Sequence, residues 1–185
     1  MTTANQKIVV LVALEMELPQ SALLDFDVHY TGVGKVNAAL KAAEIIHNDK
    51  PDLIINYGTA GGLDTSLSGL IEVGVLHQRD MDAVELGFQL GETPFDDLHS
   101  IQTGFGDVSC GTGDNFVTAP PKLSSHMVDM EAYAIAKACQ RHGVDFRCIK
   151  YISDNANSDS SDDWQANVAK GRKLFIKWLD DTILL

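Results

Sequence analysis

The stretch PDLIINYGTAGGL, residues 51–63, decides the fold. Pro51 marks the end of a preceding helix, and residues 51–58 form a short, nearly continuous apolar run. Such a run indicates a strand buried on both faces, as the strands of parallel sheets are. The glycine cluster that follows, GTAGG (58–62), forms either a turn or a place where backbone N–H groups approach a ligand closely.

Segments of two kinds alternate before this strand. KIVVLVAL (7–14) is another apolar run rich in β-branched residues, and DVHYTGVGK (27–35) indicates a short strand that ends in a glycine turn. VNAALKAAEIIHN (36–48) carries its apolar residues at helical spacing. The alternation of strand, helix and strand predicts an α/β fold with a largely parallel sheet.

The second half returns to order after a long irregular stretch. Residues 59–125 are rich in glycine and polar residues, with one strand expected near 71–77, and they indicate functional loops or an interface. MEAYAIAKACQRHG (130–143) predicts a helix that ends at its glycine, and VDFRCIKYIS (144–153) another buried strand. WQANVAKGRKLFIKWLDDTILL (164–185) predicts one amphipathic terminal helix. At this length we expect residues 1–185 to form a single domain.

The charge balance limits the partners. With 14 basic and 26 acidic residues the formal net charge is −12, which would repel a phosphate backbone and argues against nucleic acid. No apolar run approaches the length of a membrane span, and the first residues, MTTANQ, lack the features of a signal peptide. We therefore expect a cytoplasmic protein that acts on a small molecule.

Cysteine and histidine spacing predicts neither a disulfide framework nor a metal site. Cys110, Cys139 and Cys148 show no CxxC spacing and lie in or beside apolar segments, which indicates buried free thiols in a reducing compartment. The six histidines never fall at the spacing of metal ligands. We expect no metal and no cofactor.

Polar clusters follow several of the predicted strands. Because the carboxyl ends of parallel strands meet at one edge of a sheet, these clusters are expected to form one rim. GVGK among them is not a phosphate-binding loop, because that loop requires GxxxxGK followed by Ser or Thr. The clusters are Glu15 and Glu17, GVGK (32–35), GTAGG (58–62), GTGDNF (111–116), DME (129–131) and SDNAN (153–157).

Three acids at this rim each allow two interpretations. Asp129 and Glu131 stand where a helix begins, so each of them either stabilises the helix N-terminus or holds a ligand. Asp154 directly follows an apolar strand. It is either a loop or N-cap aspartate, or a partly desolvated carboxyl that keeps its proton and donates it to a substrate near neutral pH.

Taken together, these motifs resemble the nucleoside phosphorylase and nucleosidase superfamily, and look closest to the 5′-methylthioadenosine/S-adenosylhomocysteine nucleosidases. The resemblance implies a three-layer α/β fold with a mixed, largely parallel sheet between helices. It also implies hydrolysis of the N-glycosidic bond of a purine nucleoside, with adenine as the expected base. The segments that carry it are ALEMEL (13–18), GVGKVNAAL (32–40), PDLIINYGTAGGL (51–63), RDMDAVELGFQLGETP (79–94), GDNFV (113–117) and residues 128–157, from VDMEAYAIAKAC to KYISDNAN.

The resemblance also implies roles for the acids. Asp154 would donate a proton to purine N7 while the sugar becomes oxocarbenium-like. Glu17, with Glu15 nearby, would orient and deprotonate the attacking water. Glu131, together with Met130, would hold the ribose hydroxyls, which favours ligand binding over helix capping for this acid.

Other residues would shape the pocket around the substrate. By the same resemblance Phe116 would stack on the base, the backbone of Val117 would read its edge, and Trp164 would close the base pocket, although core packing is an alternative for each. Ser153, Thr59 and Gly61 would orient Asp154 and line the base and water site. Leu14 and Ala60 complete the set of substrate-binding residues.

Two alternatives to a hydrolase remain open. A phosphorylase of this fold clamps phosphate with arginines, including an early one, whereas the first arginine here is Arg79 and an acid pair stands in the early position. A phosphorylase would need an anion site rebuilt from Lys35, Arg79 or Lys150. A nucleoside-binding protein without turnover would be expected to lose Asp154 or Glu17 first, and both are present.

The chain departs from the family pattern in several places. Part of the strand after Gly74 and most of a helix between Pro94 and Gly111 are missing, which leaves the substrate scope open. Lys150 replaces a usual arginine, and Thr59 a usual serine. In the family, the segment 79–94 reaches a neighbouring subunit, which would place Leu86 and Pro94 in its pocket and predicts a homodimer.

Overall fold

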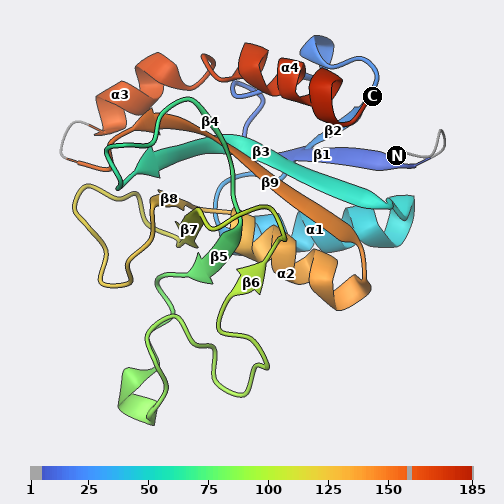
Figure 1. Cartoon of the computed structure of the whole chain (residues 1–185). Coiled ribbons are helices and arrows are strands. Elements are labelled where there is room, and N and C mark those ends of the chain that lie inside the picture. Colours follow the sequence, from blue (N-terminus) through green and yellow to red (C-terminus); the bar gives the residue numbers. More distant parts are fainter. Residues whose placement is uncertain (1–5, 158–159, 185) are drawn as a thin grey trace.

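The computed structural model describes residues 6–157 and 160–184, and its centre is a mixed sheet (Figure 1). The sheet order is β2-β1-β3-β8-β7-β5-β6, and β9 pairs with β3 and with β4. Five of the pairings are parallel, and only β3 with β8, β4 with β9 and β5 with β6 run antiparallel. The strands are β1 Ile8–Val12, β2 Asp27–Tyr30, β3 Leu53–Gly62, β4 Leu70–Glu72, β5 Val75–Gln78, β6 Ile101–Gln102, β7 Ser109–Thr112, β8 Met127–Asp129 and β9 Asp145–Asp154.

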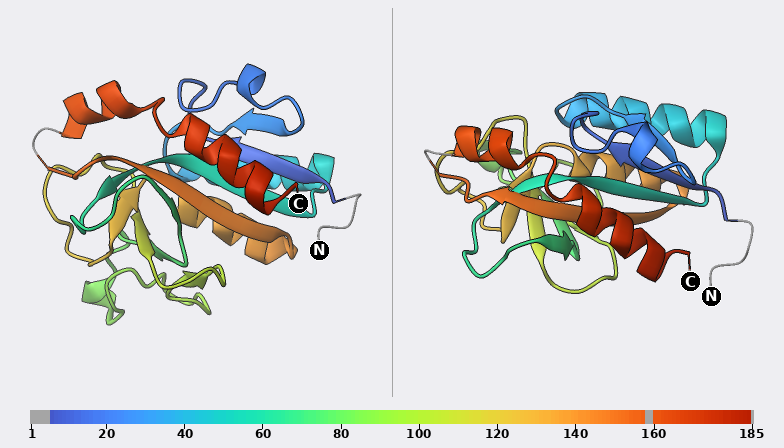
Figure 2. Two further views of the ribbon diagram at one scale, coloured as in Figure 1. Left: turned by 45° about the horizontal axis from the view of Figure 1, so that its top comes forward. Right: turned by 90° about the horizontal axis from the view of Figure 1, so that it is seen from above.

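Helices cover both faces of this sheet (Figures 1 and 2). On one face α1 and α2 pack their apolar sides against β1 and β3. On the other face lies α4, which is preceded by α3. This arrangement confirms the three-layer α/β fold with a largely parallel sheet. The helices are α1 Lys35–Asp49, α2 Ala132–His142, α3 Ser160–Asn167 and α4 Arg172–Thr182, with 3-10 turns η1 Gln20–Ala22 and η2 Val84–Leu86.

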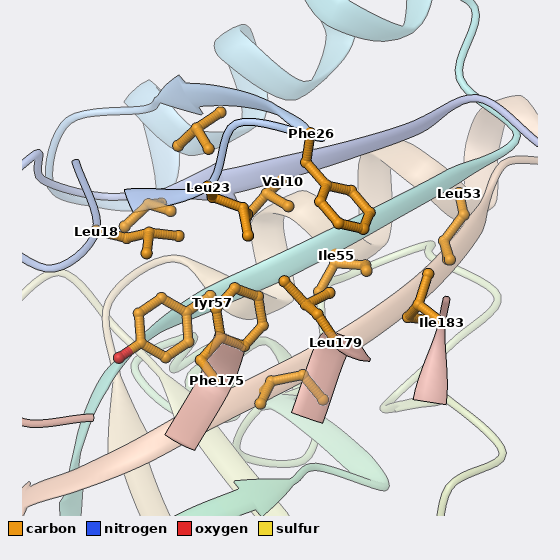
Figure 3. Packing of buried hydrophobic residues seen from close by; sticks show 13 residues of the cluster. Val10, Leu18, Leu23, Phe26, Leu53, Ile55, Tyr57, Phe175, Leu179 and Ile183 are labelled. Carbon is orange, nitrogen blue, oxygen red and sulfur yellow. The ribbon is translucent and has the colours of Figure 1, made fainter. Parts of the chain in front are cut away.

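The core beneath α4 is built from aromatic and aliphatic side chains (Figure 3). The rings of Tyr57 on β3 and Phe175 on α4 stack with centroids 4.1 Å apart. Leu179, one turn further along α4, is fully buried beside them. Burying a side chain of this size contributes roughly 1.5–3 kcal/mol, so these contacts fix α4 on the sheet.

The prediction of a single terminal helix was wrong. Residues 168–171 form a turn that ends α3, and α4 starts at Arg172. A Cβ atom at Gly171 would lie 2.4 Å from the ring of Tyr151 and 2.7 Å from the hydroxyl of Tyr57. Because the chain passes this close to the sheet, α3 and α4 become separate helices.

The glycine-rich middle region contains more sheet than expected. The single strand predicted near 71–77 is two strands, since β4 pairs with β9 and β5 pairs with β7. Gly74 separates them, and a Cβ there would lie 1.7 Å from the carbonyl oxygen of Gly106. The cluster GTAGG is not a turn, because all five residues belong to β3.

The remaining general expectations concern membranes and the chain ends. Within residues 6–157 and 160–184 no helix has the length and apolarity needed to cross a membrane. The prediction about the first residues falls mainly on residues 1–5, which lie outside the described ranges. Leu185, the last residue of the predicted terminal helix, also lies outside them.

Candidate active site

A cavity of about 190 Å³ opens at the carboxyl ends of β1, β3 and β9. Every residue predicted for the site within one chain lines this cavity. The parallel strands bring them together from positions far apart in the sequence, as expected for the carboxyl edge of such a sheet. These lining residues are Leu14, Glu17, Thr59, Ala60, Gly61, Phe116, Val117, Met130, Glu131, Ser153, Asp154 and Trp164.

Glu17 is buried, with an exposed fraction of 3%, and is held by three hydrogen bonds. Its Oε1 accepts from the backbone N–H of Thr59 (2.8 Å) and from the Thr59 hydroxyl (2.9 Å). Its Oε2 accepts from the backbone N–H of Leu14 (3.1 Å). Glu15, by contrast, is exposed and is not part of the lining. The two acids are therefore not a functional pair, and Glu17 alone faces the cavity.

Asp154 ends β9 and is also buried. Its Oδ2 accepts from the hydroxyl of Ser153 (2.8 Å), and its Oδ1 accepts from the backbone N–H of Ala156 (2.9 Å). A Cβ at Gly61 would lie 2.9 Å from Oδ1, so the carboxyl depends on a glycine there. The Thr59 hydroxyl, which was expected to help orient Asp154, donates to Glu17.

The two acids at the start of α2 have different surroundings. Asp129 caps the helix, since its Oδ2 accepts from the backbone N–H groups of Ala132 (2.8 Å) and Glu131 (3.2 Å). The side chain of Glu131 makes no capping bond. It turns to the cavity, where its Oε1 accepts from the backbone N–H of Gly34 (2.9 Å). A ligand can therefore reach Glu131 without competing with the helix.

Burial changes the acid strength of Glu131. Desolvation, followed by the charge of the neighbouring Asp129, raises the pKa of Glu131 to about 7. Lys150 and the N–H of Gly34 oppose this rise. The carboxyl therefore changes its charge near neutral pH, within the cavity.

A buried ion pair lies behind the cavity. The Lys150 ammonium is 2.8 Å from the Asp129 carboxylate, and both side chains have exposed fractions of 1%. Burial alone would lower the pKa of Lys150, but the charge of Asp129 raises it above its usual value. Desolvation in turn would raise the pKa of Asp129, and Lys150 holds it low. A Cβ at Gly58 would lie 3.3 Å from Glu17 Oε1 and 3.4 Å from Lys150 Nζ, so this cation also neighbours Glu17.

The sequence analysis missed Arg79 as a wall of the cavity. Its guanidinium donates to the carbonyl of Gly111 (3.1 Å) and to the side chain (2.8 Å) and carbonyl (2.6 Å) of Asn115. A Cβ at Gly113 would lie 2.6 Å from the guanidinium carbon, so the GTG of residues 111–113 makes room for this side chain. Arg79 could have been recognised as a site residue from its position just beyond the strand predicted near 71–77. Ala13, Val33, Asn115, Val128 and Asp129 also line the cavity without having been assigned to it.

The two residues predicted for a neighbouring subunit lie outside the cavity. Leu86 belongs to η2 in a segment that projects away from the sheet (Figure 1), and 73% of it is exposed. Pro94 follows in the same segment and is half-buried. Within one chain neither reaches the site, so their role in a partner's pocket stays a prediction.

Among the described residues, neither the cysteines nor the potential metal ligands add a reactive group to this site. Cys110, Cys139 and Cys148 are buried free thiols, and burial raises the pKa of Cys139 and of Cys148 to about 12. In the part of the chain that the structure describes, no three His, Cys, Asp or Glu side chains are grouped so that they could hold a metal ion.

Comparison with known families gives the class to which this fold and site belong. The model of the phosphorylase superfamily matches residues 28–74 and 97–183, which is most of the chain, and the protein belongs to this superfamily. The match omits residues 75–96, which contain the projecting η2 segment.

Curated relatives narrow the class to one family. The 5′-methylthioadenosine/S-adenosylhomocysteine nucleosidase of Shewanella oneidensis is 30% identical over 173 residues, covering 79% of this chain and 73% of that protein. The enzyme of the same name from Shewanella halifaxensis is 27% identical over 193 residues, covering 90% and 84%. The chain belongs to this nucleosidase family, which confirms the resemblance found in the sequence.

Solved structures show the same fold. The futalosine hydrolase of Helicobacter pylori superposes with a TM-score of 0.86 at 22% identity, covering 96% of this chain and 98% of that one. The D198N mutant of the Helicobacter pylori 5′-methylthioadenosine nucleosidase, solved with 5′-methylthioadenosine in its active site, has a TM-score of 0.85 at 20% identity, with 96% and 99% coverage.

Proposed function

We propose that this protein hydrolyses the N-glycosidic bond of an adenine nucleoside with a 5′ substituent, such as 5′-methylthioadenosine or S-adenosylhomocysteine. The observation that carries the proposal is that Glu17, Asp154 and Glu131 all line one cavity and are each 8% exposed or less. Membership of the nucleosidase family supports the substrate class.

The geometry supports a division of labour between the three acids. Asp154 protonates purine N7 as the bond between C1′ and N9 breaks, so the bonding electrons leave with a neutral base. Glu17 orients a water molecule and takes its proton as the oxygen attacks C1′. Glu131 accepts hydrogen bonds from the ribose hydroxyls, with Met130 beside it. The products are the free base and the free sugar.

Aromatic and small residues shape the base pocket around these acids. Phe116 and Val117 lie on the loop that Arg79 anchors through Asn115, and Phe116 is 46% exposed, so its ring is free to stack on a purine. Trp164 lines the cavity from α3. Leu14, Ala60 and Gly61 also line the cavity, where a larger side chain at Ala60 or Gly61 would block the ligand.

Hydrolysis is favoured over phosphorolysis because the nearby cations already have anionic or carbonyl partners. Lys35 forms an ion pair with Asp80 (2.5 Å), and Lys150 forms one with Asp129. Arg79 donates to the backbone carbonyls of Gly111, Gly113 and Asn115 and to the side-chain oxygen of Asn115. A phosphate dianion would have to displace these partners while it lay near Glu17 and Glu131.

Base release with and without phosphate tests the proposed function. The purified protein is incubated with 5′-methylthioadenosine, S-adenosylhomocysteine, adenosine and inosine, and the free base and the sugar product are followed. We expect adenine and unphosphorylated sugar to form at the same rate in both buffers. A strict phosphate requirement would instead identify a phosphorylase, and tight binding without turnover a nucleoside-binding protein.

The pKa of Glu131 predicts a pH dependence for substrate capture. Because only the ionised carboxylate accepts hydrogen bonds with both oxygens, kcat/KM should fall about tenfold per pH unit below about 7, where Glu131 becomes protonated. The Glu131→Gln variant should have a low kcat/KM without this bend. An unchanged bend in the variant would show that another group titrates there.

We further propose that the protein is a cytoplasmic homodimer in which the segment 79–94 of each subunit completes the partner's pocket. Exposed apolar side chains support this, since Val84 is 52%, Leu86 73% and Phe95 96% exposed. Sedimentation equilibrium should give twice the mass of the 20.1 kDa chain, and Leu86→Asp should shift it toward the monomer. A monomeric wild-type protein with full activity would contradict the dimer.

A further inference from the structure

A chain of two hydrogen bonds through Thr59 links Trp164 on α3 to Glu17. The indole Nε1–H of Trp164 donates to Oγ1 of Thr59 (2.9 Å), and the Thr59 hydroxyl donates to Oε1 of Glu17 (2.9 Å). All three residues line the cavity. The chain therefore runs from the helix that closes the base side to the acid assigned to water activation.

The direction of this chain is fixed by the chemistry of its members. An indole N–H can only donate, and a threonine hydroxyl has a single proton. Once Oγ1 accepts from Trp164, the Thr59 proton is free to point at Glu17, and an ionised carboxylate can only accept it. Trp164 thus holds the Thr59 hydroxyl in the rotamer that donates to Oε1.

These hydrogen bonds determine which carboxylate oxygen of Glu17 can accept a proton. Among residues 6–157 and 160–184, Oε1 receives two donors, the backbone N–H and the hydroxyl of Thr59, while Oε2 receives only the N–H of Leu14. With its two lone pairs engaged, Oε1 is a poor proton acceptor. Oε2 keeps an accepting position for the proton of the attacking water.

A second contact ties the same helix to the other acid. The side-chain amide of Asn167, also on α3, donates to the carbonyl oxygen of Ser153 (2.6 Å), and Ser153 in turn donates to Asp154. α3 is thus anchored beside both acids through two independent hydrogen bonds. Its docking sets the geometry on both sides of the cavity.

We propose that Trp164 is a positioning residue for catalysis, acting through Thr59 to orient Glu17 so that Oε2 takes the proton of the nucleophilic water. This rests on the proposed hydrolysis and adds a role beyond closing the base pocket. Phenylalanine at position 164 would keep an aromatic ring in the cavity lining but could not donate to Thr59, which makes Trp164→Phe the discriminating variant.

A double-mutant cycle tests the proposal in the full-length protein with 5′-methylthioadenosine as substrate. Trp164→Phe should lower kcat roughly 3- to 10-fold, the value of one hydrogen bond, with KM changed less than about twofold. In a Thr59→Val background, which lacks the hydroxyl, the same change should alter kcat less than about twofold. In a Thr59→Ser background, which keeps it, the full decrease should return.

The controls separate this proposal from simpler explanations. Trp178→Phe makes the same substitution in α4, where Trp178 packs on Phe175, and should leave kcat unchanged. A Trp164→Phe protein with wild-type kcat overturns the proposal, as does an equal decrease in the Thr59→Val background. If only KM rises, Trp164 serves base binding alone, and the proposal is wrong. Absence of hydrolysis by the wild-type protein would instead refute the proposed function.

Discussion

Replacing Asp154 with asparagine is expected to lower kcat by a factor of about 10²–10⁴ while the fold is retained. The amide has the size of the carboxyl but lacks an acidic proton for purine N7. It can keep both hydrogen bonds, since its oxygen accepts from the Ala156 N–H and its NH₂ can donate to the Ser153 hydroxyl. The loss should therefore lie in the chemical step.

Steady-state release of adenine from 5′-methylthioadenosine measures this effect, together with a thermal melt of both proteins. Asp25→Asn offers a matched control, because Asp25 is exposed and remote from the cavity. It should leave both kcat and the melting temperature unchanged. An Asp154→Asn protein with wild-type kcat would assign the proton donor to another group, and one that melts far below the wild type would make a folding defect the cause.

Ser153 contacts the Asp154 carboxyl without donating a proton to the substrate in the proposed mechanism, so it allows the orientation of Asp154 to be distinguished from its proton donation. Its hydroxyl is the side-chain partner of Asp154, while the backbone N–H of Ala156 is a second partner that a Ser153 substitution leaves in place. Without the Ser153 hydroxyl, the Asp154 carboxyl loses one of these two hydrogen bonds. In the mechanism that we propose, Asp154 donates the proton and Ser153 aligns the Asp154 carboxyl.

Long apolar segments made the fold predictable from the sequence. β1, β3 and β9 each contain a run of buried residues, so continuous apolar runs in the sequence indicated them, and their parallel pairing follows from the helices between them. The strands that escaped prediction, β6, β7 and β8, have two, four and three residues. Elements this short owe their geometry to pairing with distant strands, which no local pattern encodes.

The composition of the site was more predictable than its internal contacts. Asp154 could be singled out because it follows a buried strand, whereas the partner of Thr59 could not be inferred. Thr59 lies on β3 opposite Tyr151 of β9, yet its hydroxyl donates to Glu17, which lies 42 residues earlier in the chain. Such contacts depend on side-chain directions at the sheet edge. For the same reason the sequence did not separate the capping role of Asp129 from the cavity-facing position of Glu131.

Lys150→Met is expected to destabilise the protein by about 3–5 kcal/mol, the cost of leaving a buried carboxylate without its cation. The carboxylate that would lose its cation is Asp129. Its side chain has an exposed fraction of 1% and accepts a hydrogen bond from the first residue of α2. Since a domain of this size is stable by only about 5–15 kcal/mol, a large share of its stability is at stake. Urea unfolding followed by circular dichroism measures the change.

Two companion variants identify the cause of this destabilisation. Lys150→Arg keeps the charge and should retain most of the stability, whereas Lys150→Met combined with Asp129→Asn removes both charges and should recover part of what Lys150→Met loses. If the double variant is as unstable as the sum of both single variants, lost packing and not an unpaired charge explains the effect. Asp129 caps α2, and Glu131 lies in the cavity at the start of this helix. Loss of the Lys150 charge beside Asp129 should therefore also lower kcat/KM of the molecules that remain folded. The ion pair thus links the stability of α2 to the geometry of the site.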